Sequence, residues 1–472
     1  MTPRGQKQIR VRMAPSPTGP LHVGTARTAL FNFLFARHYS GTFILRMEDT
    51  DTQRSEKRFE EGIIEGLQWL GITWDEGPYR QSERRDLYET HLRRLIDEGH
   101  AYYCHCTKEE LDAEREARMA QGLPPVYGGR CRARDTNGNP PQIIRFRTPA
   151  EEEIKFKDII RDTVSFNTRV IGDFAIAKDL RSPLYNFAVV VDDEDMNITH
   201  VIRGEDHISN TPRQILLQRA LGFREVKYAH LPLILAPDRS KLSKRYLETS
   251  LDEYRKQGFL PDALVNFIAL LGWHPARDRE ILSRDELIAE FDLDRVQKGG
   301  AVFGVEKLEW MNAHYLRELP VDALVPLALD ALALARPGEA HDPALVRRVL
   351  DVERGRMKKI ADIAALADFF FILPSYEKDL LRWKDAEDVV VRGNLGRARD
   401  ALRALPTERF SPTDVRAVLD GVTPAGDRGS VFWPVRVALS GKKASPDPVE
   451  IMTVLGKDES LRRIDAAIGK FS

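Results

Sequence analysis

The chain has 472 residues, which is too long for one hydrophobic core and suggests about three to five domains. Its 71 basic and 72 acidic residues give a formal net charge of −1, which excludes a uniformly basic nucleic-acid coat and leaves only local basic patches. The three cysteines are too few for a disulfide framework, and the sequence contains no recognisable membrane span or signal peptide. We therefore expect a protein of the reducing cytoplasm without a membrane partner.

The first predicted elements are a strand, a tight loop and a helix start between residues 9 and 27. Apolar and basic residues alternate over residues 9–13, Pro and Gly follow, and apolar residues then recur at helical spacing. Residues 1–47 contain seven basic residues and no Asp or Glu. A transit peptide can also be Arg-rich and poor in acids, but Ser is sparse and the pattern favours a folded domain. A helix start of this kind predicts an anion site.

The next elements continue a βαβα pattern. Residues 42–47 are typical of a buried strand, and Glu48 begins a carboxylate cluster at its end. A helix with apolar steps of three and four residues follows. This order predicts a parallel sheet with sites at the carboxyl ends of its strands. Over residues 101–180 the residue pattern changes to clustered cysteines, a charged helix, a Pro/Gly loop and short strand-like segments, which indicates an inserted α/β domain. After it, residues 186–191 and 200–203 are predicted as strands and 212–221 as a helix.

Beyond Lys244 the chain is predicted to be mostly helical. Apolar stripes favour helices at 261–271, 321–335, 344–352 and 461–468, and no repeat of 20–50 residues is present. We expect a first domain formed by residues 1–100 and 181–250, interrupted by the insertion. Two helical domains follow at 251–320 and 321–472, the second with two lobes joined near residues 375–395.

A second basic stretch is formed by Lys241, Leu242, Ser243, Lys244 and Arg245. Its lysines and hydroxyl suit a polyphosphate, although such a run taken alone is more often a solvated surface loop. Together with the loop and helix start near the N-terminus, it favours a nucleotide.

Several motifs resemble those of bacterial glutamyl-tRNA synthetases, which are class I aminoacyl-tRNA synthetases. They occur in the order of that family and span nearly the whole chain. They are A-P-S-P-T-G-P-L-H-V-G-T-A-R (14–27), R-M-E-D-T-D (46–51), G-P-Y-R-Q-S-E-R (77–84), V-I-R-G-E-D-H (201–207), K-L-S-K-R (241–245) and K-L-E-W-M-N (307–312). The resemblance implies a Rossmann-like catalytic domain with an inserted domain that binds the tRNA acceptor end, followed by helical stem-contact and anticodon-binding domains.

The reaction implied by this resemblance has two steps. Glutamate first reacts with ATP, which enters with Mg²⁺, to give glutamyl-adenylate, and the glutamyl group then passes to the terminal adenosine of tRNA(Glu). The resemblance makes His22, Lys241 and Lys244 the catalytic residues. Its ATP-binding residues would be Pro15, Gly24, Thr25, Glu205, Leu242, Ser243 and Arg245. The family usually continues with His-Gly after K-L-S-K-R, whereas this chain has Tyr246 and Leu247, which can alter the loop or the affinity for ATP.

Recognition of glutamate requires cations for its carboxylates, and Arg can bind a carboxylate through two hydrogen bonds. The resemblance places Arg12 and Arg203 near the carboxylates and Glu48 near the ammonium group. Ala14 and Ser16 would contribute a backbone or hydroxyl contact, and Tyr185 would line the side-chain pocket. Without the resemblance, Tyr185 could equally be a core residue.

Cys104, Cys106 and Cys131 suggest a zinc site, with Tyr127 as the fourth candidate ligand. The spacing C-x-C followed by 24 residues is less specific than two C-x-x-C pairs, so three buried thiols remain the alternative. No acidic cluster indicates a dedicated magnesium cage, and we expect Mg²⁺ to be carried by the phosphates.

The tRNA surface is indicated by two local basic excesses. One is a run from Arg354 to Lys359, in which Arg356 is the expected reader of an anticodon base. The other is residues 391–472, which hold 14 basic and 10 acidic residues, with Trp433 as a candidate stacking residue. Trp310 is expected in the core. The resemblance also suggests a monomer.

Two alternative functions follow from the same motifs. One is the truncated relative that glutamylates queuosine on a tRNA, which lacks an anticodon-binding half. The other is a catalytically silent tRNA-binding paralogue, suggested by the residues that follow Arg245. Whether glutamine tRNA is also charged is open.

Overall fold

The computed structural model describes residues 8–51, 53–133, 140–242 and 250–471. These residues form two compact units. Unit 1 contains the described residues of Met1–Glu253 and Pro261–Val305, and unit 2 contains those of Tyr254–Leu260 and Glu306–Ser472. The five segments expected from the sequence divide the chain more finely, and their boundaries stay predictions.

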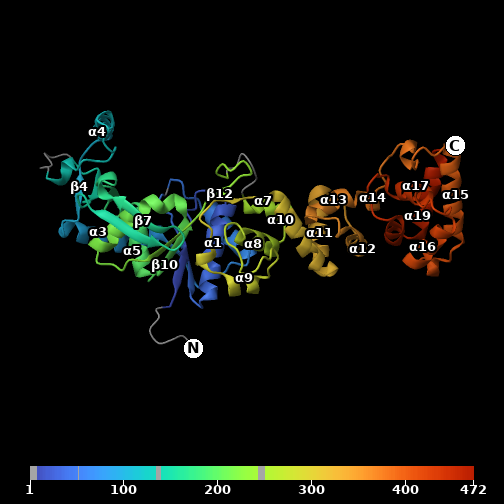
Figure 1. Ribbon diagram of the computed structural model, residues 1–472, viewed down its shortest axis with the longest axis horizontal. Coiled ribbons are helices and arrows are strands. Elements are labelled where there is room, and N and C mark those ends of the chain that lie inside the picture. Colours follow the sequence, from blue (N-terminus) through green and yellow to red (C-terminus); the bar gives the residue numbers. More distant parts are fainter. Residues whose placement is uncertain (1–7, 52, 134–139, 243–249, 472) are drawn as a thin grey trace. The chain divides into compact units, whose positions relative to one another are not determined.

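Unit 1 begins with a parallel sheet, as predicted. Its strands are β1 (Arg10–Met13), β2 (Thr42–Met47) and β3 (Glu76–Arg80), in the order β1-β2-β3. They belong to the blue N-terminal part of the chain, in which α1 is labelled in Figure 1. Helix α1 (Val23–His38) connects the first two strands, and α2 (Lys57–Trp69) connects the next two. All six residues of β2 are buried, which explains its apolar sequence.

A second sheet continues this parallel arrangement. Its strands are β10 (His200–Gly204), β11 (Lys227–Leu231), β6 (Glu153–Asp158) and β7 (Asp162–Asn167), in that order, and only β7 is antiparallel to its neighbour. The amide of Thr199 donates to the carbonyl of Arg10 at 2.9 Å, so β10 lies beside β1. The carboxyl ends of β1, β2 and β10 therefore meet at one edge.

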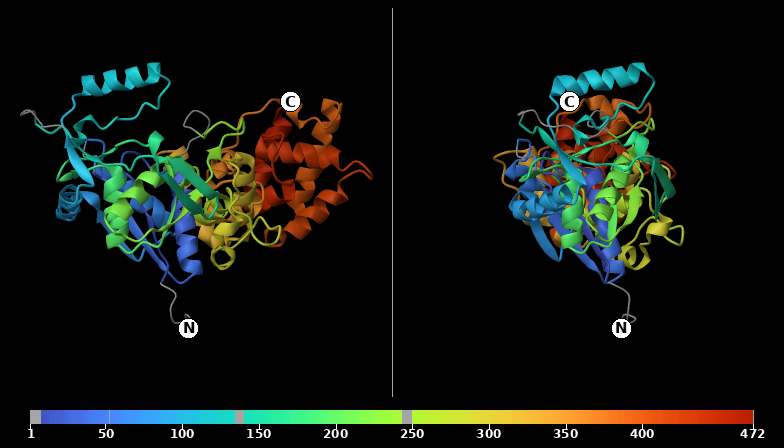
Figure 2. Two further views of the ribbon diagram at one scale, coloured as in Figure 1. Left: turned by 60° about the vertical axis from the view of Figure 1, so that its left-hand side comes forward. Right: turned by 90° about the vertical axis from the view of Figure 1, so that its left-hand side faces the viewer.

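The β6–β7 hairpin lies within residues 101–180, yet it belongs to the sheet of β10 and β11. The other strands of this segment form an antiparallel sheet in the order β4-β5-β8-β9. Their bounds are Ala101–Cys104, Ile143–Phe146, Ala175–Asp179 and Ser182–Pro183. Helix α4 (Lys108–Ala120) has no buried residue and lies apart from the sheets at the margin of unit 1 (Figure 2).

One predicted strand is wrong. Residues 186–191 lie in helix α5 (Tyr185–Asp195), not in a strand. The run of Phe and Val looked like a strand because β-branched residues favour sheets. Every residue from Phe187 to Asp193 is buried, and a helix that is apolar on all sides shows no amphipathic period. Helices α3 (Arg85–Asp97) and α6 (Thr211–Ala220) share the same core cluster.

The remaining elements of unit 1 include a pair of short strands and two helices, α8 (Pro261–Ala269) and α9 (Arg284–Glu290), that contact α1. The short parallel strands β12 (Ile234–Leu235) and β13 (Ala301–Val302) pair with each other. Helices α8 and α9 lie wholly within unit 1. Helix α7 (Leu251–Lys256) precedes them and belongs to unit 1 only as far as Glu253.

Unit 2 is helical in its described part, as predicted. Its helices are α10 (Val305–Glu318), α11 (Val321–Ala335), α12 (Pro343–Glu353), α13 (Ile363–Leu366), α14 (Asp368–Phe371), α15 (Asp388–Ala404), α16 (Pro412–Gly421), α17 (Gly429–Ser440), α18 (Pro448–Leu455) and α19 (Lys457–Gly469). The expectation that Trp310 is a core residue is wrong, because its side chain is 47% exposed. The buried stripe of α10 instead contains Leu308, Met311 and Leu316.

Among the described residues, no helix is both long enough and apolar enough to cross a bilayer.

Candidate active site

A cavity of about 820 Å³ opens in unit 1 where β1, β2 and β10 end and α1 begins. The structure brings most of the predicted site residues together around it. These are Arg12, Ala14, Pro15, Ser16, His22, Gly24, Thr25, Glu48, Tyr185, Arg203, Lys241 and Leu242. The parallel sheet explains why residues far apart in the sequence meet here.

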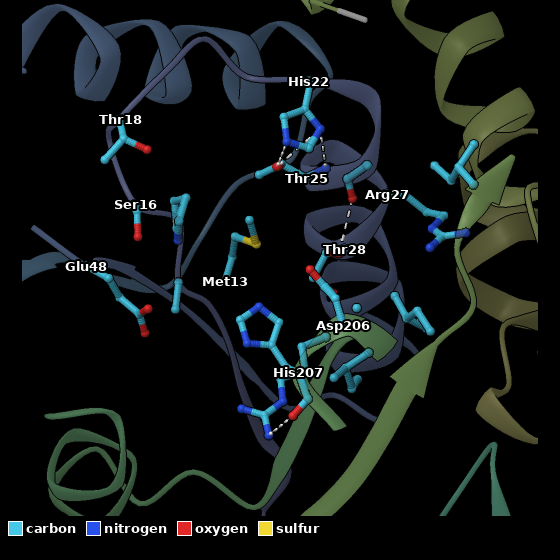
Figure 3. Close-up of a pocket in the computed structure, with 18 of the residues that line it drawn as sticks. Met13, Ser16, Thr18, His22, Thr25, Arg27, Thr28, Glu48, Asp206 and His207 are labelled. Carbon is cyan, nitrogen blue, oxygen red and sulfur yellow. Dashed lines mark hydrogen bonds between the residues drawn. The ribbon is translucent and has the colours of Figure 1, made fainter. Parts of the chain in front are cut away.

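His22 and Thr25 occupy the start of α1 (Figure 3). The His22 ring caps the helix, since its Nδ1 accepts a hydrogen bond from the Thr25 amide at 3.3 Å, and the Thr25 hydroxyl lies 3.0 Å from Nε2. Gly24 allows this arrangement, because a Cβ there would lie 3.2 Å from two atoms of the His22 ring. The first turn of α1 contains no acidic residue, so its positive dipole end is left for an anion.

A buried cluster of charges forms the floor beside β1 and β2. Arg12 Nε lies 3.1 Å from Asp193, and Arg46 lies 2.8 Å from Asp193 and 3.2 Å from Glu48. Burial opposes the charge of Asp193, but Arg12 and Arg46 outweigh it and lower the pKa of this carboxyl. Burial dominates at Glu48 and raises its pKa despite Arg46 and Arg12.

Arg203 contributes a positive charge that no described carboxylate neutralises. Its Nε donates to His230 Nε2 at 3.1 Å, and one terminal nitrogen donates to the Thr211 hydroxyl at 2.8 Å and to the His207 carbonyl at 3.5 Å. The other terminal nitrogen, NH1, is buried and has no hydrogen-bond partner among the described residues. Arg203 therefore brings a positive charge and an unsatisfied buried donor to the lining of the cavity.

Tyr185 and His207 lie on the same side as Arg203. The Tyr185 hydroxyl is 3.0 Å from Nδ1 of His207. Burial, followed by repulsion from Arg203, lowers the pKa of His207 to about 4, so this ring is neutral at neutral pH. Burial likewise raises the pKa of Tyr185. Both groups therefore offer neutral hydrogen-bonding atoms to a ligand.

Glu205 does not line the cavity. Its carboxylate forms an ion pair with Arg161 and accepts a hydrogen bond from the Leu233 amide at 2.8 Å. The basic stretch is described only at its start, where Lys241 forms a backbone bridge with Leu235 and lines the cavity. Ser243, Lys244 and Arg245, and the following Tyr246 and Leu247, lie outside the described residues.

Sequence reasoning missed several residues of this site. Asp193 lies just after the segment predicted as a strand, residues 186–191, and the two adjacent acids that follow this apolar run were a usable signal. Arg46 and His207 were within named motifs but received no role. Arg27 lines the cavity on α1, where burial lowers its pKa to about 10 and its guanidinium donates to the carbonyl of Leu271 at 3.2 Å.

The three cysteines form a separate cluster near the antiparallel sheet. All are buried, and the sulfurs of Cys104, Cys106 and Cys131 lie within 4.8 Å of one another. The Tyr127 hydroxyl is 3.5 Å from Cys106 and 3.7 Å from Cys104. A tetrahedral zinc with sulfur ligands at about 2.3 Å would hold its sulfurs roughly 3.8 Å apart, so this donor set fits zinc. Hydrogen bonds, acting against burial, also lower the pKa of Cys131 to about 7.

The basic run of unit 2 is largely engaged within the chain. Arg356 donates to Glu353 at 2.7 Å and is partly exposed, Lys358 pairs with Glu309, and Lys359 bonds to Gln257. The Trp433 indole donates to the carbonyl of Leu380 at 2.9 Å and its ring lies 5.6 Å from that of Trp383.

Comparison with known proteins gives a consistent result over the whole length. Residues 8–310 match the family described as the catalytic domain of class I tRNA synthetases (E and Q), and residues 321–468 match an anticodon binding domain. A glutamate–tRNA ligase of Heliobacterium modesticaldum is 46% identical, covering 98% of this chain and 97% of that protein. One of Desulforamulus reducens is 43% identical, with 98% and 99% covered.

Solved structures agree with these relatives. The crystal structure of a glutamate–tRNA ligase from Elizabethkingia meningosepticum, in complex with its amino acid, is 34% identical and has a TM-score of 0.87, covering 99% of this chain and 100% of that one. The glutamate–tRNA synthetase of Elizabethkingia anophelis is 35% identical with a TM-score of 0.86, covering 98% and 100%. With its parallel sheet, its helical second unit and these full-length matches, the chain belongs to the class I tRNA synthetases (E and Q).

Proposed function

We propose that this protein is a glutamate–tRNA ligase that activates L-glutamate with ATP and transfers it to the terminal adenosine of tRNA(Glu). The glutamate assignment is carried by the state of the Arg203 guanidinium at the cavity. This guanidinium forms no ion pair with a described carboxylate, and its buried NH1 has no hydrogen-bond partner among the described residues. An arginine in this state suits a substrate carboxylate. Relatives 40–46% identical over the full chain carry the same name.

In the first step a carboxylate oxygen of glutamate attacks the α-phosphorus of ATP, and the bond to pyrophosphate breaks as the new bond forms. The chain's contribution is positioning and charge, because no covalent enzyme intermediate is needed. His22, Thr25 and the positive dipole end of α1 would receive the phosphates, with Pro15 and Gly24 beside them. Lys241 and Leu242 line the same cavity, and the sequence assigns Ser243, Lys244 and Arg245 to the same task.

Glutamate would lie between the floor of the cavity and Arg203. Arg12 and Arg203 would receive its carboxylates and Glu48 its ammonium group, while Tyr185 would border its side chain. Ala14 and Ser16 follow β1 and offer backbone and hydroxyl contacts. Glu205 would act on the nucleotide only through Arg161 or the Leu233 amide, since it lies outside the cavity. Mg²⁺ would enter on the ATP phosphates and supply charge neutralisation there.

In the second step a ribose hydroxyl of the terminal adenosine attacks the anhydride carbonyl and releases AMP. Unit 2 would bind the anticodon, which is supported by the match of residues 321–468 to an anticodon binding domain. This match also disfavours the truncated queuosine-modifying relative. Arg356 is our candidate reader of an anticodon base, because it is partly exposed and its guanidinium is held by the buried Glu353. A monomer remains the expectation.

The test is glutamate-dependent exchange of pyrophosphate into ATP, measured with and without tRNA(Glu). We expect exchange with glutamate, at most weak exchange with glutamine, and dependence on tRNA. Charging of purified glutamate and glutamine tRNAs would then decide how strictly the tRNA is selected. Absence of exchange under every condition would reject the proposal in favour of a silent tRNA-binding protein.

We also propose that Cys104, Cys106, Cys131 and Tyr127 bind one zinc ion, supported by the close approach of the three sulfurs to one another and to the Tyr127 hydroxyl. The metal would hold α4 and its flanking loops to the antiparallel sheet. Elemental analysis of protein purified without chelators tests this proposal. A content below about 0.2 zinc per chain, or a Cys104→Ser variant with an unchanged content, would reject it.

A further inference from the structure

Behind Arg203 lies a pair of fully buried residues, Asp158 at the end of β6 and His230 on β11. The Asp158 carboxylate is 2.6 Å from His230 Nδ1, and both side chains are 0% exposed. His230 on β11 pairs in register with Arg203 on β10. Tyr228, two residues earlier on β11, pairs in register with Asp158 on β6. Neither Asp158 nor His230 lines the cavity. The three side chains therefore form one row across adjacent strands, with only Arg203 at the cavity.

The partners of His230 define its protonation. Asp158 accepts hydrogen bonds from the amides of Ile160 at 2.9 Å and Arg161 at 2.8 Å, and the bonds from His230 and these amides outweigh burial and lower the pKa of this carboxyl. An ionised carboxylate can only accept, so His230 Nδ1 must carry the proton. Arg203 can only donate, so Nε2 must be the acceptor. Burial also lowers the pKa of His230, which keeps the ring neutral.

This arrangement fixes the direction of the guanidinium. His230 holds Nε of Arg203, and Thr211 holds one terminal nitrogen. Because the group is planar, two held nitrogens determine where the third one, NH1, points. NH1 is the buried nitrogen without a partner among the described residues. The row therefore fixes the orientation of the guanidinium of a residue that lines the cavity, and it does not neutralise this charge directly, since the Asp158 carboxylate bonds to His230 and not to Arg203.

We propose that Asp158 and His230 are positioning residues that orient Arg203 for the carboxylate of the amino-acid substrate. The inference rests on the proposed glutamate–tRNA ligase function. It assigns His230 the part of a hydrogen-bond acceptor, not of a proton donor or acceptor in the reaction. Asp158 sets the tautomer that makes this acceptor available, as a carboxylate does when it accepts a hydrogen bond from one ring nitrogen of a histidine and leaves the other unprotonated.

Two substitutions at one position separate this role from a merely structural one. An Asn side chain can place its amide N–H near the former Nδ1, which keeps the bond to Asp158 and removes the acceptor for Arg203. A Gln side chain can place its carbonyl oxygen near the former Nε2, which keeps the acceptor for Arg203 and removes the donor to Asp158. His230→Asn and His230→Gln are therefore a matched pair, each losing a different one of the two contacts.

The measurements are pyrophosphate exchange with tRNA(Glu) present and thermal unfolding of the same preparations. We expect His230→Asn to raise KM for glutamate about 10-fold or more, with KM for ATP changed less than about twofold. Both variants should melt lower than the wild type, because Arg203 Nε loses its partner in His230→Asn and Asp158 loses one in His230→Gln. In His230→Gln, however, KM for glutamate should rise less than about threefold. An unchanged KM in His230→Asn, or a KM that follows the melting temperature in both variants, would overturn the proposal.

A second measurement uses only wild-type protein and therefore does not require either variant to fold. In the ¹⁵N spectrum of wild-type protein labelled at histidine, His230 should show a protonated Nδ1 and an unprotonated Nε2 at neutral pH. The opposite tautomer, or a doubly protonated ring, would overturn the assignment. Wild-type protein without any exchange would instead reject the proposed function itself, and the tautomer would then still report whether the row exists as described.

Discussion

Arg46 holds together the buried charges under the cavity, and its removal should destabilise this part of unit 1. The side chain is 0% exposed and lies 2.8 Å from Asp193, 3.2 Å from Glu48 and 3.7 Å from Asp192. In an Arg46→Met variant Asp193 keeps Arg12, and Asp192 keeps Arg84 at 2.7 Å. Glu48 has no other ion pair with the described residues, so it would be left buried without an ion-pair partner.

The expected loss follows from these contacts. Removing one partner of a buried ion pair costs about 3–5 kcal/mol, and the remaining partners of Asp193 and Asp192 place this case near the lower end. A loss of about 3 kcal/mol corresponds to roughly 100-fold faster exchange of the amide hydrogens of β1 and β2. Native-state hydrogen exchange measures this region directly and does not require the whole chain to unfold in one step.

The loss should also depend on pH, through Glu48. Arg46 is the main influence that lowers the pKa of Glu48 against burial, so its removal raises that pKa further. A carboxyl whose pKa is raised in the folded protein destabilises the fold. This loss grows as the pH rises from the pKa of the carboxyl in the unfolded chain toward its pKa in the folded protein. The difference between variant and wild type should therefore grow as the pH rises above about 4.5, the ordinary pKa of a Glu side chain.

Arg10→Met is the matched control. Arg10 pairs with Glu76 at 2.8 Å on the same sheet, but these side chains are 22% and 35% exposed. Such a pair is worth less than about 1 kcal/mol. Equal losses in the two variants, or a loss in Arg46→Met that does not grow between pH 4.5 and pH 8, would refute this account of the cluster.

Three further outcomes are expected. Arg203→Gln should raise KM for glutamate by a factor equivalent to about 1.5–3 kcal/mol with little change for ATP, as measured by pyrophosphate exchange, and unchanged glutamate kinetics would remove Arg203 from the pocket. Lys241→Ala should add about 2–4 kcal/mol to the barrier of adenylate formation while tRNA binding stays nearly intact, whereas an equal loss of both would indicate a structural role. Burial raises the pKa of Glu353 to about 7, so wild-type unit 2 should lose stability, by at most about 3 kcal/mol, as the pH rises from about 4.5 to 7. Thermal melts at pH 5 and pH 7.5 should show a smaller change in Glu353→Gln, and an equal change would contradict the titration of Glu353.

The fold was predictable where local pattern and tertiary packing agree. The strand over residues 42–47 and the helix over 321–335 have the predicted bounds, since the first is an apolar run closed by acids and the second an apolar helix between prolines. Helix α5 was not predictable in this way, because burial on all sides removes the period on which a helix is recognised. Trp310 shows the converse limit, in that an aromatic residue inside a motif need not be a core residue.

From the sequence, only those site residues that lie inside a recognised family motif could be predicted. Arg12 and Arg203 follow from resemblance, but Asp193 and His230, which hold them, lie in other segments of the chain. Their partnership depends on strand order and register, and these arise from long-range packing that no local spacing encodes. Orientation of the binding side chains is therefore the part of the site that only the structure provides.

The division of the chain into units has a consequence for any attempt to separate them. The chain leaves unit 1 after Glu253, contributes Tyr254–Leu260 to unit 2, returns for Pro261–Val305, and then leaves again. The short excursion is integral to unit 2, since the Leu260 amide donates to Asn312 at 2.7 Å and the Ile360 amide donates to Gly258 at 3.1 Å. A fragment that starts at Glu306 lacks this piece, and one that stops at Glu253 lacks the β13 partner of β12. The two halves are thus interlaced along the sequence, and a single cut releases neither one whole.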